Sequence, residues 1–218
     1  MLNGPATVFV VDDEADVLKA LGRLLRAAGF HVRAYDSPRV FLEACERDTV
    51  GCAVLDLSMP GLDGLGLQQA LADKGCHLPI LFLSGHGDVP ASVRAMKQGA
   101  LDFMTKPVDG ETLIGAVRNA IARDRAQREQ EAERAELEER LATLTRRELE
   151  VLRHVVSGQL NKQIAADVGT VEKTVKVHRG RVMEKLRVRS LAELVRLAER
   201  LGIVPAGTRH AAVTGATE

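Results

Sequence analysis

The sequence predicts two domains of different fold class. The first is an α/β domain with a five-stranded, doubly wound parallel sheet, and the second is an all-α domain of four helices joined to it by a helical linker. Short apolar segments alternate with amphipathic helical ones, and several apolar segments end in an acidic or hydroxyl residue. After residue 143, apolar residues recur only at helical spacing. The 218 residues suffice for two such cores.

The five predicted strands are short segments, of which residues 7–11 and 50–55 are β-rich apolar runs typical of parallel strands buried on both faces. They span residues 7–11, 31–35, 50–55, 79–84 and 101–105. A helix is predicted after each strand, in the right-handed crossover that joins parallel neighbours.

The helices between the strands have recognisable faces and ends. The first places Val17, Leu21 and Leu25 on one face and ends at Gly29. The second has Pro38 at its first position, where proline loses no helical hydrogen bond. The remaining three are predicted over residues 65–72, 88–98 and 109–121.

Acidic, hydroxyl and basic residues gather at the carboxyl edge of the predicted sheet. Asp12 and Asp13 follow the first strand, Asp56 the third, Ser84 closes the fourth, and Lys106 follows the fifth. Ligands of open α/β sheets bind outside this edge, so Asp56 is the candidate nucleophile. Clustered carboxylates need a cation, and hard oxygen ligands suit Mg2+. The set predicts phosphoryl transfer, with a purely structural ion-pair network as the alternative.

These residues carry a resemblance to a known family. They are Asp12, Asp13, Asp56, Ser84, Phe103 and Lys106-Pro107. In order and spacing they resemble the flavodoxin-like receiver domain of bacterial two-component response regulators, over about residues 5–122. The run S-G-H-G-D-V-P from Ser84 to Pro90 is similar to the FixJ branch of that family.

The resemblance implies a role for each residue. Asp56 would accept a phosphoryl group from a sensor histidine kinase. The resemblance also implies that Mg2+ is held by Asp12, Asp13, Asp56 and the backbone carbonyl of Ser58. Lys106 would contact the phosphoryl oxygens, after a cis peptide bond to Pro107. Ser84 would swing toward the phosphoryl group while Phe103 turns inward, and the domain would act on itself rather than as an enzyme.

His86 stands two residues beyond the switch hydroxyl, where receiver domains tune the lifetime of the phosphoryl group. Two hypotheses remain for it. Either His86 orients a hydrolytic water, or it is an ordinary loop histidine.

Residues 123–142 form a charged segment rich in Ala, Glu and Arg, which are strong helix formers with many possible i,i+4 pairs. A solvated helical linker is the prediction. Leu137, Leu141 and Leu144 would instead suit a dimerising seam, but the segment is too short for a coiled coil.

The domain over residues 143–203 is predicted to contain four short helices. Thr145 and Glu148 form a capping box for the first, and Asn161, Thr170 and Ser190 are the predicted caps of the others. The third helix, residues 171–186, has an apolar stripe and an opposite basic face. The stripe consists of Val171, Val175, Val182 and Leu186. Such a helix fits a DNA major groove.

The motifs L-T-R-R-E-L-E-V-L, N-K-Q-I-A and E-K-T-V-K-V-H resemble the LuxR-type helix-turn-helix of NarL/FixJ response regulators. The resemblance implies base contacts from Lys176 and Val177. Expected contacts to the DNA backbone come from Asn161, Lys162, Lys173 and Thr174. Gly180 departs from relatives that carry Lys there, and Arg179 or Arg181 is expected to compensate. A solvated basic face is the alternative.

Charge and composition agree with this division. Residues 1–121 hold 11 Lys/Arg and 15 Asp/Glu, a charge of −4, whereas residues 143–203 hold 13 and 7, a charge of +6. The basic domain therefore suits nucleic acid. The three cysteines lack metal-ligand spacing and predict reduced thiols in a cytoplasmic protein. No apolar run approaches the ~18 residues of a membrane span, and residues 204–218 are predicted to be a disordered tail.

The sequence thus predicts a transcription factor in which phosphorylation of Asp56 promotes homodimerisation and binding to double-stranded DNA. Its partners would be a sensor histidine kinase and RNA polymerase, with no membrane. Two alternatives remain. One is a phosphorylation-independent DNA-binding regulator, and the other is a magnesium-dependent phosphatase with Asp56 as nucleophile. Such phosphatases usually carry a second carboxylate two residues later, where this chain has Ser58.

Overall fold

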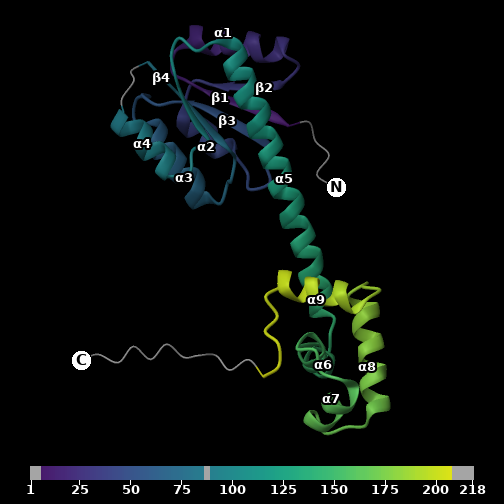
Figure 1. Cartoon of the computed structure of the whole chain (residues 1–218). Helices are drawn as coiled ribbons and strands as arrows, with labels where there is room; N and C mark the ends of the chain where they lie inside the picture. The colour runs from purple at the N-terminus through teal and green to yellow at the C-terminus, as the bar shows by residue number, and fades with distance from the viewer. Residues whose placement is uncertain (1–5, 86–88, 208–218) are drawn as a thin grey trace, which may run out of the picture. The chain divides into compact units, whose positions relative to one another are not determined.

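The computed structural model describes residues 6–85 and 89–207 (Figure 1). The chain divides into two compact units, and the boundary lies between Glu129 and Gln130 in the sequence. The predictions for His86 and for the tail beyond residue 207 lie outside the described residues. Within those residues, no helix is both long enough and apolar enough to cross a bilayer.

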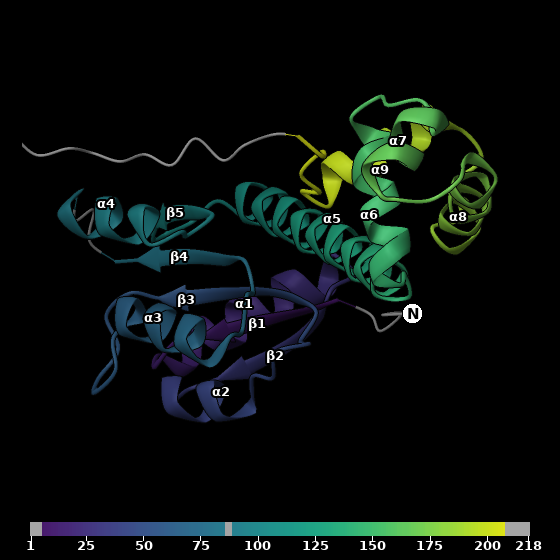
Figure 2. The same cartoon turned by 90° about the horizontal axis from the view of Figure 1, so that it is seen from below.

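The first unit contains the predicted five-stranded parallel sheet, in the order β2-β1-β3-β4-β5 (Figure 2). The strands are β1 (Thr7–Val11), β2 (His31–Tyr35), β3 (Gly51–Asp56), β4 (Ile80–Ser84) and β5 (Asp102–Thr105). The three central strands carry continuous apolar side chains because both faces of the sheet are covered. The predicted fold class is confirmed.

Helices cover the sheet on both faces. They are α1 (Ala15–Ala27), α2 (Pro38–Ala44), α3 (Gly64–Lys74), α4 (Val89–Lys97) and α5 (Gly110–Ala142). One core cluster joins Phe9, Leu55 and Phe82 to residues of α2, α3 and α4. The other joins Val10 and Val54 to residues of α1 and α5. Alternate residues of each strand therefore face different helices.

Gly51, the first residue of β3, has a backbone conformation that only glycine adopts easily. Its φ is +141°, and an added Cβ would lie 1.8 Å from the carbonyl oxygen of Thr7 on β1. The close approach of the two backbones sets where β3 begins, and with it where Asp56 falls at the other end of the strand.

The last helix of the sheet domain and the linker form one continuous helix, α5, of 33 residues. No Gly or Pro occurs between residues 116 and 142. Ion pairs at i,i+4 spacing, such as Arg134 with Glu138 at 2.8 Å, support the exposed part. The expected solvation of Leu137 was wrong, because Leu137 is buried in the core of the second unit, and Leu141 and Leu144 pack partly against it.

The second unit contains the four predicted helices. They are α6 (Arg146–Val156), α7 (Asn161–Asp167), α8 (Glu172–Lys185) and α9 (Leu191–Arg200). Leu152, Ile164 and Val175 are among the apolar side chains that pack in its core. The capping box at the start of α6 is confirmed, because the Thr145 hydroxyl accepts from the Glu148 N–H and the Glu148 carboxylate accepts from the Thr145 N–H.

Two predicted caps were wrong. Asn161 is the first residue of α7 rather than its cap, and the preceding N–H, of Leu160, donates to the Gln163 side chain. Helix α8 begins at Glu172, so its N-cap is Val171 and not Thr170. Because Val171 lies before the first helical turn in extended conformation, its side chain leaves the apolar stripe and is 64% exposed.

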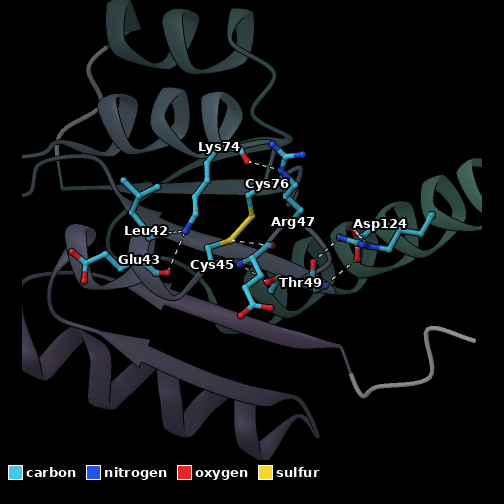
Figure 3. The surroundings of a disulfide bond; sticks show 11 residues. Leu42, Glu43, Cys45, Arg47, Thr49, Lys74, Cys76 and Asp124 are labelled. Carbon is cyan, nitrogen blue, oxygen red and sulfur yellow. Dashed lines mark hydrogen bonds and ion pairs between the residues drawn. A yellow bond between two sulfur atoms is a disulfide. The ribbon is translucent and has the colours of Figure 1, made fainter.

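The expectation of three reduced cysteines was also wrong. Cys45 and Cys76 are joined as a disulfide, whereas Cys52 is free and buried (Figure 3). The pairing could not be read from spacing, because 31 residues separate the two cysteines and the packing of α2 against α3 brings them together. Burial, with a smaller effect of Asp124, raises the pKa of the Cys52 thiol to about 12.

Candidate functional site

Two buried carboxylates lie side by side at the carboxyl edge of the sheet. Val11 of β1 is in register with Leu55 of β3, so Asp12 and Asp56 occupy adjacent positions directly beyond that pair. Asp12 is 1% exposed and Asp56 is 5% exposed. The register of two parallel strands therefore brings together two acids that are 44 residues apart in the chain.

A single lysine bridges the two acids. The Lys106 ammonium lies 2.7 Å from the Asp12 carboxylate and 2.6 Å from that of Asp56. The exposed carboxylate of Glu14 lies 3.7 Å away from the same nitrogen. One positive charge thus faces two buried carboxylates and a third, exposed one.

Backbone amides hold the other carboxylate oxygens. The Ser58 N–H donates to Asp56 Oδ2 at 2.7 Å, and the Glu14 N–H donates to Asp12 Oδ1 at 2.9 Å. Each donor lies two residues beyond its acid, in the turn that follows the strand. Both carboxylates are consequently fixed in orientation before any ligand arrives.

Burial and the contacts within the pocket act on the pKa values of Asp12 and Lys106. Burial raises the pKa of Asp12 above its ordinary value, although hydrogen bonds from Lys106 and Glu14 oppose the shift. Burial also opposes protonation of Lys106, but its hydrogen bonds to Asp12 and Asp56 outweigh that effect and raise its pKa. With two buried acids and a single ammonium, the pocket carries more negative than positive charge when both acids are ionised.

The predicted switch residues lie next to this pocket. Ser84 ends β4 and is buried, and its carbonyl oxygen accepts from the Lys106 N–H at 2.7 Å. The peptide bond between Lys106 and Pro107 is cis, as predicted. Phe103 is partly buried, with its ring centroid 6.4 Å from that of Phe82.

Asp13 does not join the acids in the pocket. Its side chain is exposed, and among residues 6–85 and 89–207 no three acidic, histidine or cysteine residues form a group that could hold a metal ion. The donor chemistry of the pocket still fits Mg2+, because two oriented carboxylates with too little positive charge beside them are hard oxygen ligands. The ligand set of Asp12, Asp13, Asp56 and the Ser58 carbonyl stays a prediction.

The second unit presents a basic surface on α8. Lys173, Lys176, Val177 and Arg181 are exposed, and Thr174 is half-buried. Val175 and Val182 point the opposite way into the core. The Lys176 ammonium has one acidic neighbour, Glu172, at 3.9 Å. Because both side chains of that pair are mostly exposed, it restrains Lys176 little.

The predicted residues on α7 and α8 are partly tied to one another. Lys162 is exposed, but Asn161 is half-buried and its side-chain oxygen accepts from Arg179 at 2.6 Å. This contact joins the start of α7 to the middle of α8. Two arginines were expected to compensate for Gly180. Arg179 already has a partner in Asn161, whereas Arg181 is exposed.

Sequence reasoning missed a buried ion pair that joins α6 to α8. The Lys185 ammonium lies 2.6 Å from Glu148 and also donates to the Thr143 carbonyl at 2.9 Å. The hydrogen bond from Lys185, followed by that from the Thr145 N–H, lowers the pKa of Glu148 to about 2. Glu148 was predicted only as a capping residue, and no local signal pairs it with a lysine 37 residues away.

Comparison with known proteins identifies the family of each unit. Residues 8–118 match the response regulator receiver domain family, and residues 142–198 match the luxR family of bacterial regulatory proteins. Nodulation protein W of Bradyrhizobium diazoefficiens is 46% identical over 198 residues, which cover 91% of this chain and 87% of that protein. The transcriptional regulatory protein FixJ of Azorhizobium caulinodans is 43% identical over 199 residues, covering 91% and 94%.

Solved structures are similar as well. The response regulator StyR matches with a TM-score of 0.84 and 44% identity over 90% of this chain and 100% of that one. Full-length FixJ from B. japonicum matches with a TM-score of 0.57 and 39% identity, covering 91% and 98%. The chain therefore belongs to the two-component response regulators of the NarL/FixJ family, with an N-terminal receiver domain and a C-terminal LuxR-type DNA-binding domain.

Proposed function

We propose that a sensor histidine kinase phosphorylates Asp56 and that this modification switches the chain as a transcription regulator. The single observation that carries the proposal is the position of Lys106, whose ammonium lies 2.6 Å from the buried Asp56 carboxylate. A carboxylate with a fixed cation beside it is built to accept and retain a phosphoryl group.

The residues of this pocket would each have a part in the proposed phosphoryl transfer. A carboxylate oxygen of Asp56 attacks phosphorus, the bond from phosphorus to the kinase histidine breaks, and an acyl phosphate remains. The Ser58 N–H fixes the orientation of the Asp56 carboxylate, and Lys106 neutralises charge on the phosphoryl oxygens. Mg2+, when bound by Asp12, Asp13, Asp56 and the Ser58 carbonyl, would supply further charge neutralisation.

Phosphorylation is proposed to promote a homodimer through the exposed apolar face of α4. Val89, Val93 and Met96 are 69%, 46% and 48% exposed, and their spacing places them on one side of that helix. Ser84 ends the strand that precedes α4. A shift of the Ser84 hydroxyl toward a phosphoryl group would therefore act on the segment that leads into this face.

The dimer is proposed to bind double-stranded DNA with α8 in the major groove. Lys176 and Val177 would read base edges, and Lys162, Lys173 and Thr174 would contact the DNA backbone. Lys173, Lys176 and Val177 are exposed on α8, which supports this assignment. Thr174 is half-buried on the same helix, and Lys162 is exposed on α7. RNA polymerase is the proposed further partner and the cytoplasm the proposed location, since a regulator of transcription acts on the chromosome.

Mass spectrometry with a small phosphodonor tests the acceptor assignment. Wild-type protein with Mg2+ should gain one phosphoryl group, and Asp56→Asn should gain none, because an amide does not form the acyl phosphate. Asp73→Asn, which alters an exposed acid on α3, should react like wild type. A phosphoryl adduct that persists in Asp56→Asn would contradict the assignment.

Binding to a random DNA pool tests the output. Phosphorylated wild-type protein should enrich a sequence with two related half-sites, and Asp56→Asn given the same phosphodonor should not. Equal enrichment by both proteins would favour a regulator that binds DNA independently of phosphorylation.

A further inference from the structure

The disulfide lies where two helices of the receiver domain meet. Cys45 directly follows α2 and Cys76 follows Gly75 at the end of α3, and both side chains are buried. Figure 3 shows the two sulfur atoms bonded between these helix ends. The bond closes a loop between residues 31 positions apart.

The helix ends are also held together without the disulfide. The Lys74 ammonium donates to the carbonyls of Leu42 and Glu43 at 2.6 and 3.2 Å, and Arg47 donates to the Lys74 carbonyl at 3.2 Å (Figure 3). Because these contacts do not involve sulfur, they would keep Cys45 and Cys76 close after reduction. The pair is therefore positioned to form and break its bond reversibly.

A cavity of about 510 Å³ gives access to one of the two cysteines. Cys76 lines it, together with His77 and Arg123, whereas Cys45 does not. Of the two bonded cysteines, Cys76 is therefore the one that borders a space large enough for a small reagent. Cys52, whose thiol pKa is raised to about 12, stays unreactive.

The segment that follows Cys45 is hydrogen-bonded to helix α5. The Thr49 carbonyl accepts from Arg128 at 2.6 Å, and the Gly51 N–H donates to the buried Asp124 carboxylate at 3.0 Å. Arg128 also pairs with Asp124 at 2.9 Å. Residues 46–50 thus connect the disulfide to the segment of α5 around Asp124, all within the first unit.

We propose that Cys45 and Cys76 form a reversible redox pair that a hydroperoxide oxidises, and that the disulfide state sets how firmly residues 45–51 hold helix α5. Disulfides of proteins in reducing compartments are mostly transient or redox-sensing, which suits a pair beside a cavity. The inference requires neither phosphorylation nor DNA binding.

The chemistry balances with the peroxide as oxidant. The Cys76 thiolate attacks one peroxide oxygen, the O–O bond breaks, and a sulfenic acid forms with release of water or an alcohol. The Cys45 thiol then attacks the Cys76 sulfur, the S–O bond breaks as the S–S bond forms, and the sulfenic oxygen leaves as water. Two thiols lose two electrons and two protons in total, and the peroxide is reduced. A dithiol reductant reverses the reaction by thiol–disulfide exchange.

Alkylation and mass spectrometry test the redox pair in the full chain. The protein is reduced, exposed to hydrogen peroxide or left untreated, then denatured and alkylated with iodoacetamide. Of the three cysteines, all should be alkylated in the reduced sample, and only Cys52 in the oxidised one. Full alkylation of both samples would overturn the redox pair.

Hydrogen exchange tests the coupling to α5. Amides of residues 45–51 and 122–128 should exchange about tenfold more slowly in the oxidised protein than in the reduced one, because the cross-link suppresses local opening. Peroxide should leave these rates unchanged in Cys76→Ser and in Cys45→Ser, whereas Cys52→Ala should respond like wild type. A wild-type chain that forms the disulfide but shows the same rates in residues 122–128 would overturn the coupling.

Discussion

Each unit of this protein contains a buried lysine–carboxylate contact, and the two contacts differ in charge balance. In the receiver domain Lys106 is shared by Asp12 and Asp56, and burial raises the pKa of Asp12. In the DNA-binding domain the half-buried Lys185 pairs with one acid, Glu148, and the pKa of Glu148 falls to about 2. A site that lacks positive charge is prepared for a ligand, whereas a balanced pair stabilises the fold.

Removing the acid of the balanced pair should have the largest effect on stability. Glu148→Gln should lower the free energy of unfolding of the second unit at pH 7 by about 3 kcal/mol, the energy that corresponds to its pKa depression. Amide exchange of α6 residues measures the loss. Glu150→Gln, which alters an exposed pair with Arg147, should cost less than about 1 kcal/mol. Equal losses in both variants would refute the distinction.

The same pair predicts a pH dependence. Because the folded-state pKa of Glu148 is lowered from 4.5 to about 2, its contribution is complete above pH 4.5 and is lost as the pH falls toward 2. Wild type and Glu148→Gln should therefore differ most above pH 4.5 and converge at the acid end. A gap that stays constant down to pH 2 would contradict this.

Lys176, unlike Lys106 and Lys185, has only a weak, exposed ion pair with Glu172. Lys176→Ala should weaken specific DNA binding by about 2 kcal/mol and relax the preference for one base pair, if the lysine contacts a base. Lys162→Ala should instead weaken binding to all sequences alike and reduce its salt dependence. Titrations on the selected site and on single-base variants distinguish the two. An unchanged base preference in Lys176→Ala would remove it from that role.

Asp12→Asn should shift stability in the direction opposite to Glu148→Gln. Neutralising one of two acids that share Lys106 should stabilise the Mg2+-free receiver domain, because burial raises the pKa of Asp12 and so disfavours its charged form. Asp13→Asn, at an exposed acid, should have almost no effect. Urea unfolding followed by Tyr35 fluorescence measures both, and a loss of stability in Asp12→Asn would refute the proposed excess of negative charge.

Gly180→Ala should have the smallest effect on stability among these substitutions, controls aside. An added Cβ at this position meets nothing within 4 Å, and the residue lies in the interior of α8. Gly180→Ala should therefore stabilise the DNA-binding domain by about 0.5 to 1 kcal/mol through its helix propensity. Hydrogen exchange of α8 amides measures the gain. Unchanged exchange of the α8 amides in Gly180→Ala would contradict the expected gain.

The receiver site could be predicted because its residues follow from local pattern. Asp56 and Ser84 lie at the ends of apolar strands, and parallel strands place such ends at one edge. The register that sets Asp12 beside Asp56 was implicit in that topology. The exposure of Asp13 was not, because the sequence does not determine how the turn after β1 directs consecutive side chains.

Contacts between distant segments were beyond sequence reasoning. Neither Lys185 with Glu148 nor Cys45 with Cys76 has a local signal, since each pair depends on how two helices pack. The wrong caps at Asn161 and Thr170 have a different cause. Cap preferences do not fix the residue at which a helix begins: α7 begins at Asn161 itself, and α8 begins at Glu172, two residues after Thr170.

The steric constraint at Gly51 limits which residues can occupy the start of β3. Any other residue there would place a Cβ 1.8 Å from the Thr7 carbonyl oxygen, which would force β1 and β3 apart. A library of all twenty amino acids at this position, screened for transcription in cells, should retain glycine alone. Gly51, at the opposite end of β3 from Asp56, would then tolerate as little variation as a residue of the pocket itself.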